Sequence, residues 1–191
     1  ETELLVEAAI ETARFVKRGA QVIDILDLGT GSGNIAISLT KFITDCKIIA
    51  SDSSRGALRV ARKNARVNMT AGRIRFILSD LFKDLPPVKF DIIVTNPPYV
   101  ASSDIASLQR EVRREPRAAL DGGPDGLDFY RKIISASRGY LHRGGFILFE
   151  IGLGQADGVR ELLEEGGFAD IRFRRDYSNI MRVAIARWTS W

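Results

Sequence analysis

Hydrophobic positions along the chain alternate between short apolar runs and longer stretches with helical spacing. The short runs are rich in Ile, Val, Leu and Phe and predict strands at 22–28, 47–51, 73–79, 89–95, 144–151, 168–175 and 180–187. The longer stretches predict helices at 3–18, 33–43, 54–68, 127–140 and 155–165. Alternating strands and helices favour an α/β fold with a largely parallel sheet that is covered on both faces. The last two strands look antiparallel, with Asn179 near the turn between them.

The composition is typical of a folded protein and argues against a membrane span and a cysteine-based metal site. The 191 residues are 45% hydrophobic and 27% charged, and a chain of this length predicts a single domain over residues 1–191. No apolar run approaches the roughly 20 residues of a membrane span, and the opening segment lacks a signal-peptide pattern. Cys46 is the only cysteine, which excludes an internal disulfide and argues against a thiolate metal site. We expect no metal, no membrane contact and a cytoplasmic location.

The net charge of +4 permits a polyanionic partner without requiring one. A basic stripe recurs at helical spacing on the predicted helix 54–68 and consists of Arg55, Arg59, Arg62, Lys63 and Arg66. We favour a solvated helix face for this stripe, and contact with RNA or an acidic partner is the alternative. A second cluster is a candidate partner surface in the long irregular stretch 96–126 and consists of Arg110, Arg113, Arg114 and Arg117.

A glycine-rich turn follows the first predicted strand and precedes a helix. Its candidate ligand-binding residues are Gly29, Thr30, Gly31, Ser32 and Gly33. Glycines let the backbone approach a ligand closely, and the start of the helix presents free N–H groups. The G-x-G-x-G spacing is one residue tighter than the dinucleotide-binding pattern. This spacing favours a ligand with a carboxylate tail, such as S-adenosylmethionine, over a pyrophosphate.

Acidic residues stand at the ends of the next two predicted strands. Asp52 ends the second strand, where a carboxylate can accept hydrogen bonds from the hydroxyls of a ribose. Capping of the following helix is an alternative role for Asp52 that is compatible with the first. Asp80 follows the third strand and can accept a hydrogen bond from an adenine amino group, while Leu81 beside it offers an apolar contact.

The segment Asn96-Pro97-Pro98-Tyr99 directly follows the fourth predicted strand. The two prolines stiffen the backbone and remove two N–H donors, which leaves an edge rich in acceptors. The Asn96 side-chain oxygen and the Pro97 carbonyl can each accept one hydrogen of a planar –NH2 group, and Tyr99 offers a ring face.

An amide or exocyclic amine nitrogen shares its lone pair with a π system and is therefore a weak nucleophile. Acceptors for both of its hydrogens stabilise the positive charge that develops as the nitrogen attacks a methyl group. We therefore predict a catalytic role for Asn96, Pro97 and Tyr99, substrate contacts along the whole Asn96–Tyr99 segment, and a cofactor contact for Asn96.

The motifs DLGTGSG, SDSS, SDLF and NPPY, each at a strand end, resemble those of the class I S-adenosylmethionine-dependent methyltransferases. Two families of this class carry the NPPY motif: adenine-N6 methyltransferases of nucleic acids, and the HemK/PrmC-type glutamine-N5 methyltransferases of peptide chain release factors. The segment EPRAALDGGPDGLDFYR at 115–131 is similar to the HemK type. So are the opening ETELLVE and the later FEIG with Gln155, and the resemblance covers essentially the whole chain.

The HemK-type resemblance implies a fold, a reaction and a partner. The fold is a Rossmann-like sheet of seven strands with a reversed last strand. The reaction moves a methyl group from S-adenosylmethionine, leaving S-adenosylhomocysteine, to the glutamine of a release factor's Gly-Gly-Gln motif. This family usually carries a small helical domain ahead of the segment with which this chain begins. The alternatives are adenine-N6 methylation of RNA or DNA, and a non-catalytic cofactor-binding module; we do not favour nucleic-acid contact.

Overall fold

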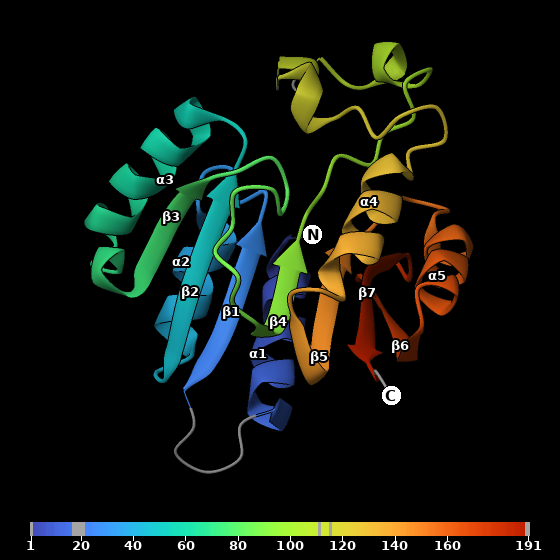
Figure 1. Ribbon diagram of the computed structural model, residues 1–191. Coiled ribbons are helices and arrows are strands. Elements are labelled where there is room, and N and C mark those ends of the chain that lie inside the picture. The colour runs from blue at the N-terminus through green and yellow to red at the C-terminus, as the bar shows by residue number, and fades with distance from the viewer. Residues whose placement is uncertain (1, 17–21, 111, 115, 190–191) are drawn as a thin grey trace.

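A computed structural model describes residues 2–16, 22–110, 112–114 and 116–189. Within these residues one sheet has the strand order β3-β2-β1-β4-β5-β7-β6 (Figure 1). Its strands are β1 (Ile23–Leu28), β2 (Cys46–Asp52), β3 (Ile74–Leu78), β4 (Phe90–Thr95), β5 (Leu141–Glu150), β6 (Phe168–Arg175) and β7 (Met181–Trp188). Neighbouring strands from β3 to β5 are parallel, whereas β7 is antiparallel to both β5 and β6. The predicted α/β fold with a reversed last strand is confirmed.

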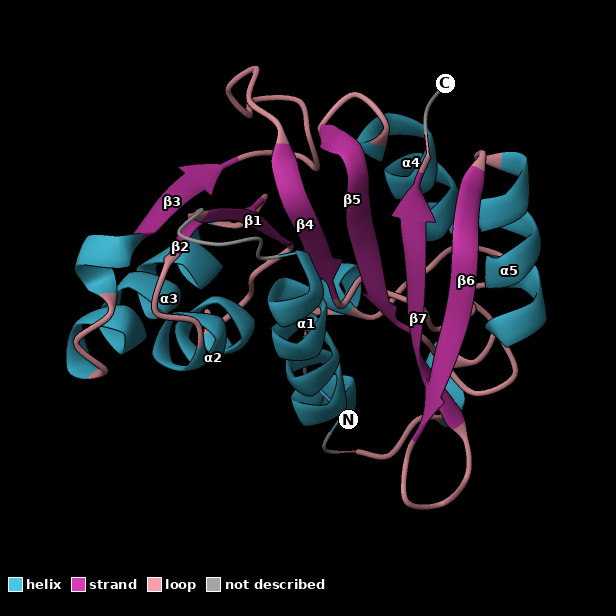
Figure 2. Cartoon of the chain, turned by 90° about the horizontal axis from the view of Figure 1, so that it is seen from below, coloured by secondary structure: helices cyan, strands magenta, loops and turns pink. Residues whose placement is uncertain are grey.

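Helices cover both faces of the sheet (Figure 2). They are α1 (Thr2–Val16), α2 (Asn34–Phe42), α3 (Arg55–Val67), α4 (Asp128–Ser137) and α5 (Ala156–Glu165). Helices α1 to α3 pack against one face, and α4 and α5 pack against the other, which gives two separate hydrophobic cores. The predicted end of the first helix, at 17–18, lies outside the described residues.

The central strands are buried on both sides because their side chains alternate between the two cores. In β4, Ile92 and Val94 pack with α1 and α2, whereas Ile93 between them packs with α4. All residues of β4 are buried. Continuous apolar runs of this kind are typical of parallel strands covered by helices, and they explain why the strands could be predicted from the sequence.

Two predicted boundaries are wrong by three residues. The helix predicted over 127–140 ends at Ser137. The expected strand 144–151 begins earlier, at Leu141, because the strand continues through the glycine pair that we interpreted as its start. Phe90 of β4 pairs with Leu141, but Ile92 pairs with Phe146, so the register shifts at an irregularity in the strand. Gly144 has φ of +85° there, and a glycine in such a conformation is typical of a β-bulge.

The long segment 96–126 is folded back on itself above the carboxyl ends of the strands (Figure 1). It contains single turns of 3-10 helix at Ile105–Ser107, Val112–Arg114 and Arg117–Ala119. The Val100 N–H donates to the Leu120 carbonyl at 3.0 Å, and the Gly122 N–H donates to the Val100 carbonyl at 2.8 Å. The two ends of the segment are therefore paired, although the sequence shows no periodicity here.

Across the part of the chain that the structure describes, no helix combines the length and the apolar character needed to cross a membrane.

Candidate functional site

The predicted site residues lie at one edge of the sheet, at the carboxyl ends of four adjacent strands. Leu28, the last residue of β1, pairs with Ser51 of β2 and with Thr95 of β4. Gly29 and Asn96 therefore each follow directly after the end of one of two neighbouring strands. Neighbouring strands in a sheet are separated by about 5 Å. The chain leaves β1 toward β2 and β3 and then returns to β4 on the other side. This reversal of strand order is where open α/β sheets bind ligands.

The glycine turn leaves open space on its outer side. Gly29 and Gly31 have φ of +74° and +56°, and a Cβ added to either would meet no atom within 4 Å. Gly33 differs, because a Cβ there would lie 3.1 Å from the Cβ of Ala61 on α3. The N–H groups of Gly29 and Thr30 both donate to the Ser51 carbonyl at 2.8 Å. The first two glycines thus combine a left-handed backbone with room for a ligand, and the third permits close packing.

Asp27 lies directly beneath this turn and was absent from the predicted site residues. Its Oδ2 accepts hydrogen bonds from the Thr30 hydroxyl at 2.6 Å and from the Ala36 N–H at 3.0 Å. Its Oδ1 and the nearby Ser51 hydroxyl are buried without a partner in the described residues. Burial raises the pKa of Asp27 to about 7. Orphaned polar atoms are rare in protein interiors, and two beneath an open glycine turn fit a site that a polar ligand completes.

Asp52 fastens the glycine turn to the second strand. Its Oδ2 accepts from the Gly31 N–H at 2.9 Å, and its Oδ1 accepts from the Ser54 N–H at 2.8 Å. The alternative role as helix cap is wrong, because Ser54 caps α3 by accepting from the Ala57 N–H at 3.2 Å. A carboxylate has about four lone-pair sites, so each oxygen of Asp52 keeps the capacity to accept from a ribose hydroxyl.

Asp80 and Leu81 lie in a strained turn after β3. Leu81 has φ of +51°, a left-handed conformation that branched apolar residues seldom adopt. The Ser79 hydroxyl donates to the Leu81 carbonyl at 2.7 Å and accepts from the Asp84 N–H at 3.0 Å, which holds the turn. The Ser79 N–H donates to the Asp52 carbonyl at 3.0 Å, so both acidic residues share one edge. The Asp80 side chain is exposed.

The Asn96–Tyr99 segment presents acceptors that the described residues leave unused. Asn96 is half-buried, and no described residue forms a hydrogen bond with its side-chain amide or with the Pro97 carbonyl. Pro97 is buried, and Pro98 is partly buried. The ring of Tyr99 packs against the core beneath α4, close to the turn after β5. The segment therefore combines a fixed backbone with a free amide oxygen and a free carbonyl.

Two further sequence features that the resemblance marked lie together. The Thr2 hydroxyl at the start of α1 donates to Oε2 of Glu150 at 3.0 Å, although 148 residues separate the two. Glu150 is buried at the end of β5. The opening segment is thereby tied to the sheet edge that carries the candidate site. Glu1 and Glu115, which belong to the resembling segments, lie outside the described residues.

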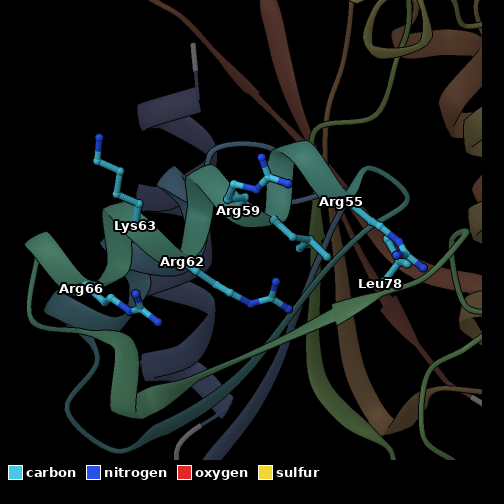
Figure 3. A pocket seen from close by; sticks show the side chains of 7 residues that line it. Arg55, Arg59, Arg62, Lys63, Arg66 and Leu78 are labelled. Atoms are coloured by element: carbon cyan, nitrogen blue, oxygen red, sulfur yellow. The ribbon is translucent and has the colours of Figure 1, made fainter.

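The basic stripe lines a groove of about 500 Å³ between α3 and the edge strand β3 (Figure 3). None of the predicted site residues lines this groove, whose apolar floor includes Leu58 and Leu78. Arg62 reaches across toward β3, where it donates to the Phe76 carbonyl at 3.3 Å and lies over the Phe76 ring. The groove is thus separate from the site at the strand ends.

The second arginine cluster lies on the long segment 96–126, and its members are exposed or partly paired. All four arginines are exposed, and Arg117 also forms an ion pair with Asp121 at 3.1 Å. Among the described residues, no group of three or more His, Cys, Asp or Glu side chains is arranged to hold a metal ion.

Comparison with known proteins identifies the family. The family model for the methyltransferase small domain matches residues 2–125. The chain belongs to this family. Its relatives include a protein named release factor glutamine methyltransferase from Geobacter sulfurreducens, 40% identical over 188 residues, which are 98% of this chain and 63% of that protein. A protein of the same name from Chlorobaculum tepidum is 42% identical over 190 residues, which are 95% of this chain and 63% of that protein. The chain thus spans less than two thirds of these relatives.

Solved structures of methyltransferases share the fold of this family member. A ribosomal protein L11 methylase from Lactobacillus delbrueckii subsp. bulgaricus superposes with a TM-score of 0.69 at 22% identity, covering 96% of this chain and 77% of that one. The METTL16 methyltransferase domain superposes with a TM-score of 0.71 at 18% identity, covering 100% of this chain and 84% of that one. At these identities the likeness concerns the fold alone.

Proposed function

We propose that this methyltransferase-family chain transfers a methyl group from S-adenosylmethionine to a glutamine side-chain nitrogen in the Gly-Gly-Gln motif of a peptide chain release factor. The observation that carries the proposal is the pair of unused acceptors on Asn96 and Pro97, next to an open glycine turn. The names of the relatives support the choice of glutamine over adenine. Because release factors act in translation, the proposal also assigns the chain to the cytoplasm.

The residues at the ends of β1, β2 and β3 fit the cofactor by their donor and acceptor types. The turn from Gly29 to Gly33 would hold its carboxylate tail, and Asp52 would accept from its ribose. Asp80 and Leu81 would contact its adenine. When bound, S-adenosylmethionine supplies a methyl group on a positively charged sulfur. In this proposal Asn96 borders both the cofactor and the acceptor.

The acceptor residues act on the glutamine amide. Asn96 Oδ1 and the Pro97 carbonyl each accept one of its N–H hydrogens, and Pro98 and Tyr99 confine its flat group from the side. These contacts become stronger as positive charge develops on the nitrogen, so they stabilise the transition state more than the ground state. A nitrogen–carbon bond forms while the carbon–sulfur bond breaks, and the amide then loses one proton to solvent. Asn96 takes no proton, because a carboxamide is not a base at neutral pH.

The test is a methyl-transfer assay with a release factor and with mixed nucleic acid, each incubated with methyl-labelled S-adenosylmethionine. The proposal predicts label on the Gly-Gly-Gln peptide, found by mass spectrometry, and none after its glutamine is changed to alanine. Label in N6-methyladenine would instead identify an adenine methyltransferase. Cofactor binding without transfer to either acceptor would indicate a non-catalytic module. Asn96→Ala serves as the negative control for methyl transfer to either acceptor.

A further inference from the structure

Gln155, at the start of α5, uses both ends of its side-chain amide. Its Nε2 donates to the Tyr99 carbonyl at 2.8 Å and to the Gly126 carbonyl at 3.2 Å. Its Oε1 accepts from the Gly152 N–H at 2.9 Å, and the Tyr130 hydroxyl lies 3.3 Å from the same oxygen. Two carbonyls require the nitrogen end and an N–H requires the oxygen end, so the orientation of the amide is determined by its partners.

These partners belong to segments that are far apart in the sequence. Tyr99 ends the acceptor segment, and Gly126 ends the long segment that follows it. Gly152 lies in the turn after β5, and Tyr130 lies on α4, where its hydroxyl donates to the Glu150 carbonyl at 2.9 Å. The Gln155 side chain therefore joins the two ends of the long segment to the edge of the sheet.

Two glycines allow the backbone to pack closely around the side-chain amide of Gln155. A Cβ at Gly126 would lie 2.5 Å from the Tyr99 carbonyl oxygen and 2.6 Å from Nε2 of Gln155. A Cβ at Gly152 would lie 2.8 Å from Oε1 of Gln155 and 3.0 Å from Cδ2 of Tyr99. A Cβ atom at these distances would overlap its neighbours. Only glycine therefore lets the backbone at both positions come this close to Gln155. The ring of Tyr99 and the amide of Gln155 thus share one tightly packed unit.

We propose that Gln155 is a positioning residue for methyl transfer: it holds the main chain of Tyr99 and thereby fixes the acceptor segment that contains Asn96 and Pro97. The identity of the acceptor rests on the proposed function, whereas the hydrogen bonds of Gln155 do not. An acceptor group misplaced by about 1 Å can slow a reaction by about a hundredfold without weakening the binding of a second substrate. The effect of losing Gln155 should therefore be larger on turnover than on cofactor affinity.

Gln155→Glu tests this role with a side chain of the same shape. An ionised carboxylate would turn an oxygen toward the Tyr99 and Gly126 carbonyls and repel both, whereas a protonated carboxyl restores one donor. Titratable side chains near this position include Tyr99, Tyr130 and Glu150, together with Asp125 beside Gly126 and Asp157 on α5, and all are also present in the wild-type chain. Comparison of the variant with the wild type at each pH therefore isolates the introduced carboxyl.

The expected result is a kcat at about pH 8 at least about tenfold below wild type, with the dissociation constant for S-adenosylmethionine changed by less than about threefold. The ratio of variant to wild-type kcat should rise as the pH is lowered to about 6, because protonation restores the donor. Gln109→Glu is the matched control, since Gln109 is exposed on the same long segment. It introduces the same charge and should leave kcat unchanged.

Hydrogen exchange of the ligand-free chain separates failure of this proposal from failure of the proposed function. Peptides covering 97–103 and 120–128 should exchange faster in Gln155→Glu than in Gln109→Glu at about pH 8, whatever reaction the protein catalyses. Unchanged exchange, or a kcat of Gln155→Glu equal to wild type, would overturn the positioning role. A wild-type chain that methylates no release factor would overturn the proposed function instead, and hydrogen exchange would still decide the role of Gln155.

Discussion

Asp27→Asn should flatten the pH dependence of stability. Burial raises the pKa of Asp27 from an ordinary 3.8 to about 7, and the hydrogen bonds from Thr30 and Ala36 only partly oppose this effect. The folded protein therefore holds the Asp27 proton more tightly than the unfolded chain does. The resulting stabilisation is present below about pH 4 and is lost as the pH rises through 7. The difference between these two pKa values corresponds to about 4 kcal/mol, and more than half of it is lost between about pH 5 and pH 8.

The assay is urea unfolding of the ligand-free protein at several pH values between about 5 and 8. The free energy of unfolding should fall by roughly 2 to 3 kcal/mol more in the wild type than in Asp27→Asn over this range. Other titrating groups are common to both proteins, so they cancel in the difference. Thr30→Val removes a hydrogen bond that lowers the Asp27 pKa and should move the loss to higher pH. Parallel curves for wild type and Asp27→Asn would refute the reasoning.

Three other variants test the site and its surroundings. Asn96→Ala should lower methyl transfer by at least about a hundredfold while calorimetry finds cofactor affinity within a few fold; an equal loss of affinity would contradict the division of roles. Gly126→Ala should cost about 3 kcal/mol or more in chemical unfolding, because its φ is +75° and its Cβ would overlap the Tyr99 carbonyl; Gly72→Ala, with no atom within 4 Å, is the control. The double variant Arg59→Gln, Arg66→Gln should have an unchanged or slightly higher melting temperature, because it removes repulsion between like charges on one helix. Its methyl transfer should be unchanged. Weaker binding of a release factor would make the basic stripe a partner surface.

The strands and the positions at their ends were predictable because burial and periodicity are local properties of the sequence. Four of the six residues in β1 and four of the six in β4 are large apolar residues, so the ends of these runs mark where Gly29 and Asn96 begin the turns. Parallel pairing then brings those turns to one edge without further information. The turn at Asn179, where φ is +63°, was equally predictable from the sequence, because asparagine tolerates the left-handed region.

Features that depend on distant partners could not be predicted in this way. The placement of β7 between β5 and β6 follows from pairing that an antiparallel pattern alone does not specify. The buried, partly unpaired state of Asp27 depends on β2 and β4, which flank its strand in the sheet. The conformation of the segment 96–126 depends on Gln155, which lies beyond the end of the segment in the sequence.

The most direct measurement is a crystal structure of the protein with S-adenosylhomocysteine and a Gly-Gly-Gln peptide. The account predicts that the glutamine side-chain nitrogen donates to Asn96 Oδ1 and to the Pro97 carbonyl and faces the sulfur atom of the bound product. Asn96 turned away from that sulfur would contradict it. So would a glutamine side chain bound anywhere else on the protein.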